Sequence, residues 1–290
     1  MKRLLPLLAL IASPLMAQDA QQRIDWNKPA EPFRLIGNVH YVGTDGLSAY
    51  LIVDPKGHVL IDGGLPESAP LIAANIARLG FRMRDVRHLL INHAHYDHSG
   101  GLAELKRASG AKLVASAGDA PDLVAGRTIG RPELDGFPPV RVDRIVGQGA
   151  AVTIGATRLV AHMTPGHTKG CTSWAMTTRD PAVRRGKPVS VLFACSITTA
   201  GQPLTGAKDY PSAAADFRAT FARLDRIEAD VFLNFHPEFF NLAAKRARLI
   251  AGDRAAFVDP AELPRQVAKA RAGFEVELAR QRALPAIRAQ

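Results

Sequence analysis

The chain has 290 residues, of which 47% are hydrophobic and 22% are charged, and its formal net charge is +10 at pH 7. This length and apolar content are typical of a globular protein with one large domain or two small ones, and they exclude a disordered chain. A basic chain can bind nucleic acid, but here the basic residues are scattered, mostly as single Arg residues, and no nucleic-acid-binding motif accompanies them. We therefore expect no nucleic-acid partner.

The chain begins with the features of an export signal. Met1, Lys2 and Arg3 form a short basic start, residues 4–15 are mostly apolar, and Ala17 offers a small residue for cleavage. This pattern predicts a signal peptide over residues 1–17 and a mature periplasmic protein over residues 18–290. An uncleaved membrane anchor is the alternative. No other stretch approaches the ~20 apolar residues of a membrane span, so we expect none in the mature protein.

The first half of the mature chain alternates between strand and helix patterns. Residues 48–64 (SAYLIVDPKGHVLIDGG) predict a β-hairpin around Pro55, Lys56 and Gly57. A helix is predicted over residues 68–79, since Pro70 stands near its start and Gly80 just beyond its end. A buried strand (RHLLIN, 87–92), a helix (GLAELKRAS, 101–109) and a strand (AKLVAS, 111–116) follow. A connection rich in Gly and Pro, residues 126–149, then interrupts the pattern.

The second half starts with a predicted hairpin around Gly155 (residues 151–164). Two further strands, CTSWAMTT and VSVLFAC, flank the turn sequence RDPAVRRGKP. A helix is expected over residues 212–228, then a buried strand (DVFLNF, 230–235) and C-terminal helices. We predict an α/β fold in which two β-rich halves, residues 24–150 and 151–290, form a single domain with two sheets sandwiched between outer helices.

Cys171 and Cys195 are the two cysteines of the chain. They lie at the start of one predicted strand and the end of the next, so a hairpin would place them side by side. Export to an oxidising compartment would then allow a disulfide between them. Two buried free thiols are the alternative.

The sequence INHAHYDHSGG, residues 91–101, places three histidines and an aspartate within six residues. It follows an apolar strand, where a turn can direct His93 and His95 at one point while Asp97 and His98 reach a second. Imidazole and carboxylate groups that lie this close together can bind divalent metal ions. Paired ions ~3.5–4 Å apart are a known catalytic arrangement. His167 and His236 also follow predicted strands, so they are further candidate metal ligands. We interpret four histidines within or beside strands as structural: His40, His58, His88 and His162.

The chain contains the sequences DWNKPAEPFRLIGNVHYVGT near its start, VLIDGG, HAHYDH, GHTKGCTSW and a late HP. In these sequences it resembles the subclass B3 metallo-β-lactamases, and the resemblance extends over nearly its whole mature length. The resemblance implies a four-layer αβ/βα sandwich of two mixed sheets with outer helices, and two Zn²⁺ ions at one edge. It assigns His93, His95 and His167 to the first zinc, and Asp97, His98 and His236 to the second. A second zinc bound through Cys195 is the local alternative.

The resemblance also implies an enzyme that hydrolyses β-lactam antibiotics and gives resistance to them. The oligomeric state stays open, and a monomer is the default expectation. A zinc-bound hydroxide oriented by Asp97 would attack the cyclic amide. Asp62 would support the histidines from behind, Ser196 and Thr198 would bind the substrate carboxylate, and Trp26 and residues 201–212 would form walls of the cleft. Two alternatives stay open. Asp62 can be a plain turn residue, and Ser196 and Thr198 can carry ordinary strand-end hydroxyls.

Two other functions are possible on the same fold. One is a glyoxalase-II-like thioesterase or lactonase, although such enzymes usually place a metal-bridging carboxylate where this chain reads LFACSITT. The other is a zinc-binding scaffold without catalysis.

Overall fold

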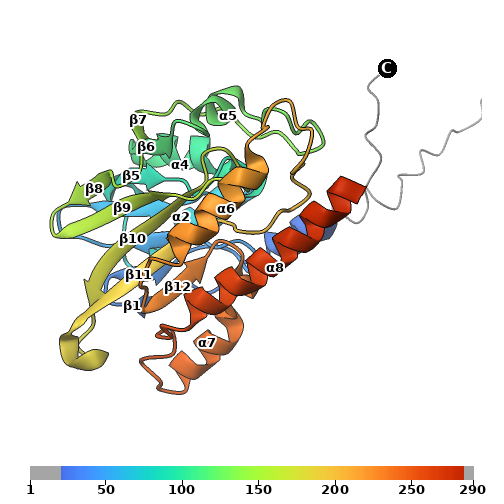
Figure 1. Ribbon diagram of the computed structural model, residues 1–290. Helices are drawn as coiled ribbons and strands as arrows, with labels where there is room; N and C mark the ends of the chain where they lie inside the picture. Colours follow the sequence, from blue (N-terminus) through green and yellow to red (C-terminus); the bar gives the residue numbers. More distant parts are fainter. Residues whose placement is uncertain (1–20, 284–290) are drawn as a thin grey trace, which may run out of the picture.

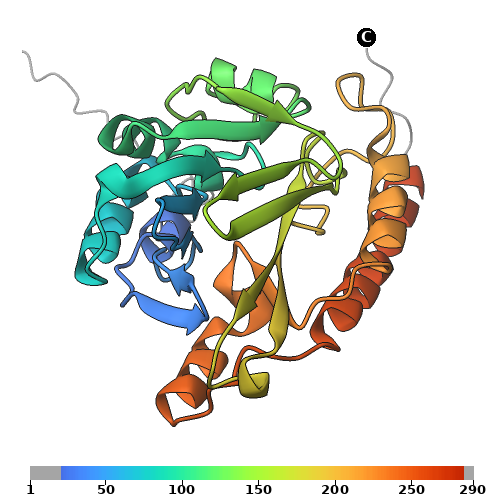
Figure 2. The ribbon, with the colours of Figure 1, turned by 90° about the vertical axis from the view of Figure 1, so that its left-hand side faces the viewer.

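The structure is a computed structural model that describes residues 21–283. The strands in this range form two mixed sheets. The sheets stack face to face, with helices on the outer side of each, as Figures 1 and 2 show. The α/β sandwich predicted from the sequence is therefore confirmed. The predicted signal peptide, residues 1–17, lies outside the described residues.

The first sheet contains seven strands in chain order. They are β1 (Phe33–Ile36), β2 (Val39–Tyr41), β3 (Tyr50–Ile52), β4 (His58–Ile61), β5 (Val86–Leu90), β6 (Lys112–Ser116) and β7 (Arg144–Val146). Strands β1 to β4 pair antiparallel, and β4 to β7 pair parallel. Parallel neighbours need a crossover. The crossovers contain α2 (Ala69–Arg78), α3 (Tyr96–Ser99), α4 (Leu102–Ser109) and α5 (Ala120–Ala125), with short 3₁₀ turns η1 (Pro66–Ser68) and η2 (Met83–Asp85).

The second sheet has the order β12-β11-β10-β9-β8. Its strands are β8 (Ala151–Ile154), β9 (Thr157–Met163), β10 (Thr172–Arg179), β11 (Pro188–Ala194) and β12 (Val231–Asn234). All neighbours pair antiparallel except β11 and β12, which are parallel and joined through α6 (Ala213–Leu224). Helices α7 (Leu242–Ile250) and α8 (Glu262–Ala283) follow, and η3 (Arg184–Gly186) and η4 (Pro237–Phe240) are 3₁₀ turns.

Alternation along the strands of the first sheet divides the core in two. Tyr50 and Ile52 face the second sheet, whereas Leu51 between them faces the outer helices. Successive side chains of a strand point to opposite faces, so both faces of this sheet are buried. Trp174 of β10 is fully buried between the sheets, and its indole N–H donates to the carbonyl of Ile91 (3.1 Å). The second sheet is thereby fixed against the end of β5, where the histidine motif begins.

The hairpins expected around Gly57 and Gly155 are both present, as is the antiparallel pair on either side of RDPAVRRGKP. The expected helix over residues 212–228 is shorter, because it ends at Leu224 and Ile227 packs on the core from the turn that follows. Strand β7 lies within the connection 126–149, which was predicted to be irregular. No helix among residues 21–283 combines the length and apolar character needed to cross a membrane.

Candidate metal centre

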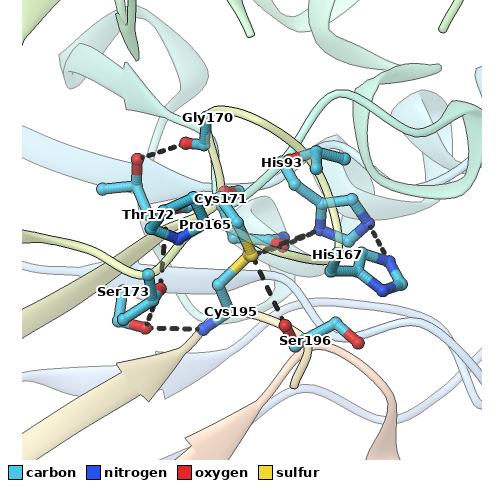
Figure 3. The surroundings of a disulfide bond; sticks show 12 residues. His93, Pro165, His167, Gly170, Cys171, Thr172, Ser173, Cys195 and Ser196 are labelled. Carbon is cyan, nitrogen blue, oxygen red and sulfur yellow. Dashed lines mark hydrogen bonds between the residues drawn. A yellow bond between two sulfur atoms is a disulfide. The ribbon is translucent and has the colours of Figure 1, made fainter. Parts of the chain in front are cut away.

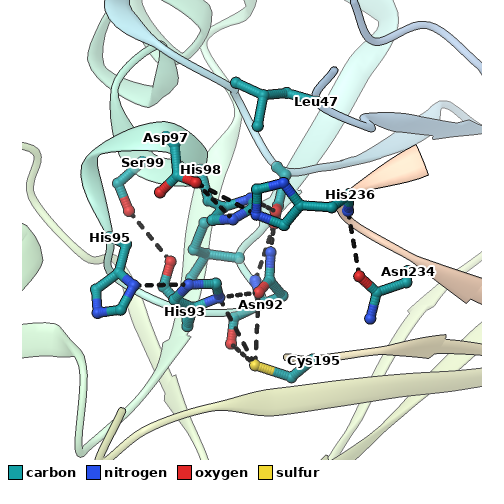
Figure 4. Close-up of polar contacts among 12 residues, drawn as sticks. Leu47, Asn92, His93, His95, Asp97, His98, Ser99, Cys195, Asn234 and His236 are labelled. Carbon is teal, nitrogen blue, oxygen red and sulfur yellow. Dashed lines mark hydrogen bonds and ion pairs between the residues drawn. The ribbon is translucent and has the colours of Figure 1, made fainter. Parts of the chain in front are cut away.

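The structure brings together all six side chains that the sequence analysis assigned to metal binding. His93 and His95 lie between β5 and α3, and α3 itself carries Asp97 and His98. The other two follow strands of the second sheet: His167 lies in the β9–β10 loop, and His236 follows β12. Figure 4 shows five of these side chains converging at the edge where the two sheets meet. Five of the six are buried, and the side chain of His236 is 14% exposed.

Three ring nitrogens converge at a first point. The distance from His93 Nε2 to His95 Nδ1 is 3.1 Å, and from His93 Nε2 to His167 Nε2 it is also 3.1 Å. Burial lowers the pKa of His93 and of His95 well below the usual value, and it lowers the pKa of His167 to about 4. All three rings are therefore neutral at pH 7.

Neighbouring groups determine which nitrogen of each ring carries the proton. His93 Nδ1 contacts the side-chain oxygen of Asn92, and His167 Nδ1 donates to the backbone carbonyl of Thr198 (2.8 Å). With the proton on Nδ1 in both rings, the two Nε2 atoms face each other with lone pairs. Two lone pairs at 3.1 Å repel unless a cation lies between them. The residues present therefore fit a metal ion.

The second group converges on the carboxylate of Asp97. His98 Nε2 and His236 Nε2 each lie 3.3 Å from Asp97 Oδ2. Burial alone would raise the pKa of Asp97, but His98 and His236 outweigh it and hold that pKa well below the usual value. The carboxylate is therefore ionised, as a metal ligand must be.

Asp62 lies behind the second group, at the end of β4. Its carboxylate accepts a hydrogen bond from the backbone N–H of Asn92 (2.9 Å) and lies 3.1 Å from His98 Nδ1. Burial raises the pKa of Asp62 to about 6, against the opposing effect of His98. Its φ of 66° also makes it a turn residue. The two interpretations of Asp62 are thus compatible, because the turn directs the carboxylate at both His98 and Asn92.

Asp119 connects the histidine loops and was not singled out from the sequence. Its carboxylate accepts hydrogen bonds from the backbone N–H groups of Ala94 (3.0 Å) and Gly170 (2.8 Å) and from the hydroxyl of Thr168 (3.0 Å). Ala94 lies between the first two histidines of the motif, and Thr168 follows His167. An aspartate shortly after a strand is too common a pattern to reveal this role in advance.

Cys171 and Cys195 form a disulfide with a Cα–Cα distance of 5.9 Å, as expected for the ends of the antiparallel strands β10 and β11. Figure 3 shows the bond beside His93. Cys195 Sγ lies 3.8 Å from His93 Nδ1, the nitrogen that points away from the other two rings. The geometry does not support Cys195 as a ligand in the second group, because its sulfur is bonded to Cys171 and lies behind His93.

A cleft of about 310 Å³ opens over the two groups. Trp26 forms one side, with its ring centroid 5.4 Å from that of His236. Ser196 and Thr198 also line the cleft, and their hydroxyl oxygens lie 3.0 Å apart. Residues 201–212, expected as another wall, instead line a smaller hollow of about 110 Å³ beside His167. The cleft has walls that the sequence did not reveal: Tyr96, Leu134 and Phe239.

The four histidines interpreted as structural take no part in any candidate metal group within residues 21–283. His40 and His58 pack edge-on against the ring of Phe81, with centroid distances of 5.3 and 5.2 Å. His88 and His162 lie on strands β5 and β9.

The chain is similar to known proteins in both sequence and structure. The sequence model of the metallo-β-lactamase superfamily matches residues 42–178. The structure aligns with BJP-1, a subclass B3 metallo-β-lactamase of Bradyrhizobium japonicum, at 44% identity and a TM-score of 0.84, covering 89% of this chain and 97% of that one. FEZ-1 from Legionella gormanii aligns at 35% identity and a TM-score of 0.85, covering 89% and 99%.

Comparison by sequence alone matches relatives with a different named function. A hydroxyacylglutathione hydrolase of Rhodopseudomonas palustris is 35% identical over 119 residues, which is 41% of this chain and 39% of that protein. The match thus spans about two fifths of the relative's length, whereas the two lactamase structures are matched almost completely.

Proposed function

Because the chain belongs to the metallo-β-lactamase superfamily, and aligns with nearly complete chains of its subclass B3, we propose that it hydrolyses β-lactam antibiotics and gives resistance to them. The observation that carries the proposal is the second ligand group. His98 and His236 both contact one carboxylate oxygen of Asp97, and the end of β11 holds a disulfide instead of a bridging carboxylate.

Two Zn²⁺ ions fit the donor set, since imidazole and carboxylate are ligands that zinc prefers. His93, His95 and His167 would hold the first, and Asp97, His98 and His236 the second. Zinc supplies Lewis acidity, which lowers the pKa of a nearby water and stabilises developing negative charge. Asn92 and the carbonyl of Thr198 hold two of the rings in the required tautomer, and Asp62 orients His98.

The remaining side chains position the reactants. Hydrolysis forms a C–O bond to the lactam carbonyl, breaks the C–N bond and leaves a proton on the ring nitrogen. Asp97, at the floor of the cleft, accepts a hydrogen bond from the attacking water and so orients it. The hydroxyls of Ser196 and Thr198 donate to the substrate carboxylate, and Trp26 confines the substrate from the opposite side.

A thioesterase or lactonase is the second candidate, and it is favoured by the curated relatives named hydroxyacylglutathione hydrolase. The stretch LFACSITT at the end of β11 contains neither Asp nor Glu, which argues against that function.

We also propose that the protein acts in the periplasm as a monomer. The disulfide is compatible with an oxidising compartment. All six proposed ligands come from one chain, so the centre needs no second subunit.

The test compares substrates on one zinc-loaded preparation. Initial rates are measured with a chromogenic cephalosporin, S-lactoylglutathione and a simple lactone. The proposal predicts that kcat/KM for the cephalosporin exceeds the other two by at least about 10²-fold, a typical scale for discrimination by a site built for one substrate. Faster turnover of the thioester would favour the second candidate.

A further inference from the structure

A second cavity, of about 250 Å³, lies beside the metal cleft. It lies between β12, η4, the segment 196–199 that follows β11, and α8, the long helix that runs past β12 in Figure 1. None of the six proposed zinc ligands lines it. It shares Ser196, Thr198 and Phe239 with the metal cleft, so the two spaces have a common wall.

The chemistry of the lining indicates what it can hold. Three aromatic rings, those of Phe232, Phe239 and Phe274, face the cavity. An apolar cavity of ~150 Å³ accommodates benzene, so this one has room for a ring that carries a substituent. Lys269 is exposed at the same cavity, and within residues 21–283 no carboxylate lies within ion-pair distance of it. A free ammonium beside an aromatic lining favours an anionic group on an apolar ligand.

Gly273 offers a position at which the cavity can be altered. It lies inside the 22-residue helix α8, where glycine is unfavourable, and it borders the cavity. Its backbone does not need glycine, since its φ is not among the positive ones, and an added Cβ would meet no atom within 4 Å. Gly273 is exposed at the border of the cavity, so a larger side chain can be introduced there without a clash at its Cβ.

We propose that this cavity binds a small aromatic carboxylate, with its ring among the three phenylalanines and its carboxylate beside Lys269. Because Ser196 and Thr198 line both spaces, the occupant would also contact the wall of the metal cleft. The proposal is independent of the proposed function, since binding is measured without turnover.

The test is a fluorine NMR titration of the zinc-loaded full chain with para-fluorophenylacetate. The proposal predicts saturable binding with a Kd on the order of a millimolar or tighter. Gly273→Phe should weaken it by at least about ten-fold by filling the cavity. The matched control is Ala272→Phe, which adds the same side chain at the neighbouring exposed position and should leave the Kd unchanged.

Lys269→Gln is a second variant that changes only an exposed side chain, and it should weaken binding several-fold. Equal affinity in the wild type and Gly273→Phe would overturn the proposal, because the ligand would then bind elsewhere, such as in the metal cleft. Absence of saturable binding to the wild type would overturn it as well.

Discussion

The side-chain oxygen of Asn92 contacts His93 Nδ1, and this contact turns the unprotonated Nε2 of His93 toward His167. Asn92 is itself fixed, because its backbone N–H donates to Asp62. Replacing Asn92 by Ala should therefore weaken zinc binding by about 10–100-fold, the usual effect of losing the partner of a histidine ligand. Competition with a chromogenic chelator measures the change. The control is Asn75→Ala, since Asn75 is also buried but binds backbone carbonyls of Val42 and Gly43. Equal losses in both variants would contradict this role of Asn92.

His98 distinguishes the two proposed zinc sites. It contacts Asp97 and shares a candidate ligand group with Asp97 and His93, but among residues 21–283 it is in no group with His95 and His167. His98→Ala should bind one equivalent of zinc instead of two and lose about 10²-fold in kcat, the scale of removing one preorganised electrostatic contact. Metal analysis after dialysis, together with steady-state rates, gives both quantities. His162→Ala, on strand β9, should keep two equivalents and full activity. Retention of two zinc ions by His98→Ala would refute the assignment.

Ser196 provides a hydroxyl at the cleft, and we propose that this hydroxyl binds the substrate carboxylate. Ser196→Ala should raise KM by about five-fold, equivalent to roughly 1 kcal/mol for one hydrogen bond, with kcat little changed. Thr153→Ala, at an exposed position of β8, is the matched loss of a hydroxyl and should leave KM unchanged. An unchanged KM in Ser196→Ala would show that its hydroxyl is an ordinary strand-end group.

Asp54 links the turn after β3 to the β8–β9 hairpin. Its carboxylate accepts hydrogen bonds from the backbone N–H groups of Lys56, Ala156 and Thr157, and these lower its pKa. A lowered folded-state pKa means that the stabilisation is fully present above the unfolded pKa of about 3.9 and is lost as pH falls below it. Asp54→Asn should therefore lower the free energy of unfolding by about 2 kcal/mol at pH 7, and by less near pH 3.

Urea unfolding at both pH values measures this difference, with Asp45→Asn as the control at an exposed carboxylate. If Asp54→Asn lowered the free energy of unfolding equally at both pH values, the charge of the Asp54 carboxylate would not be the source of the stabilisation.

The sequence was sufficient for the groups of the site that are close along the chain or follow strands. HAHYDH is local, and His167 and His236 stand at strand ends, so the sandwich brings them to one edge. It was not sufficient for partners fixed only by tertiary contact. The carbonyl of Thr198 orients His167 across 31 residues, and Asp119 connects two loops through backbone N–H groups. A backbone acceptor leaves no residue type to recognise, and a single aspartate has no distinguishing spacing.

The walls of the cleft show the same limit. Trp26 was expected there and lines it, but Leu134 comes from the connection 126–149 and Phe239 from a short 3₁₀ turn. The conformation of such loops depends on which surfaces they meet, and local pattern does not encode that.

We propose that β-lactam hydrolysis by this protein requires zinc in this centre. The most direct measurement follows chromogenic cephalosporin turnover by the purified protein before chelation, after chelation and dialysis, and after titration with Zn²⁺. We expect activity to be lost on chelation and to return as two equivalents of zinc are added. No turnover by the protein with two zinc ions bound, or turnover that survives their removal, would contradict it.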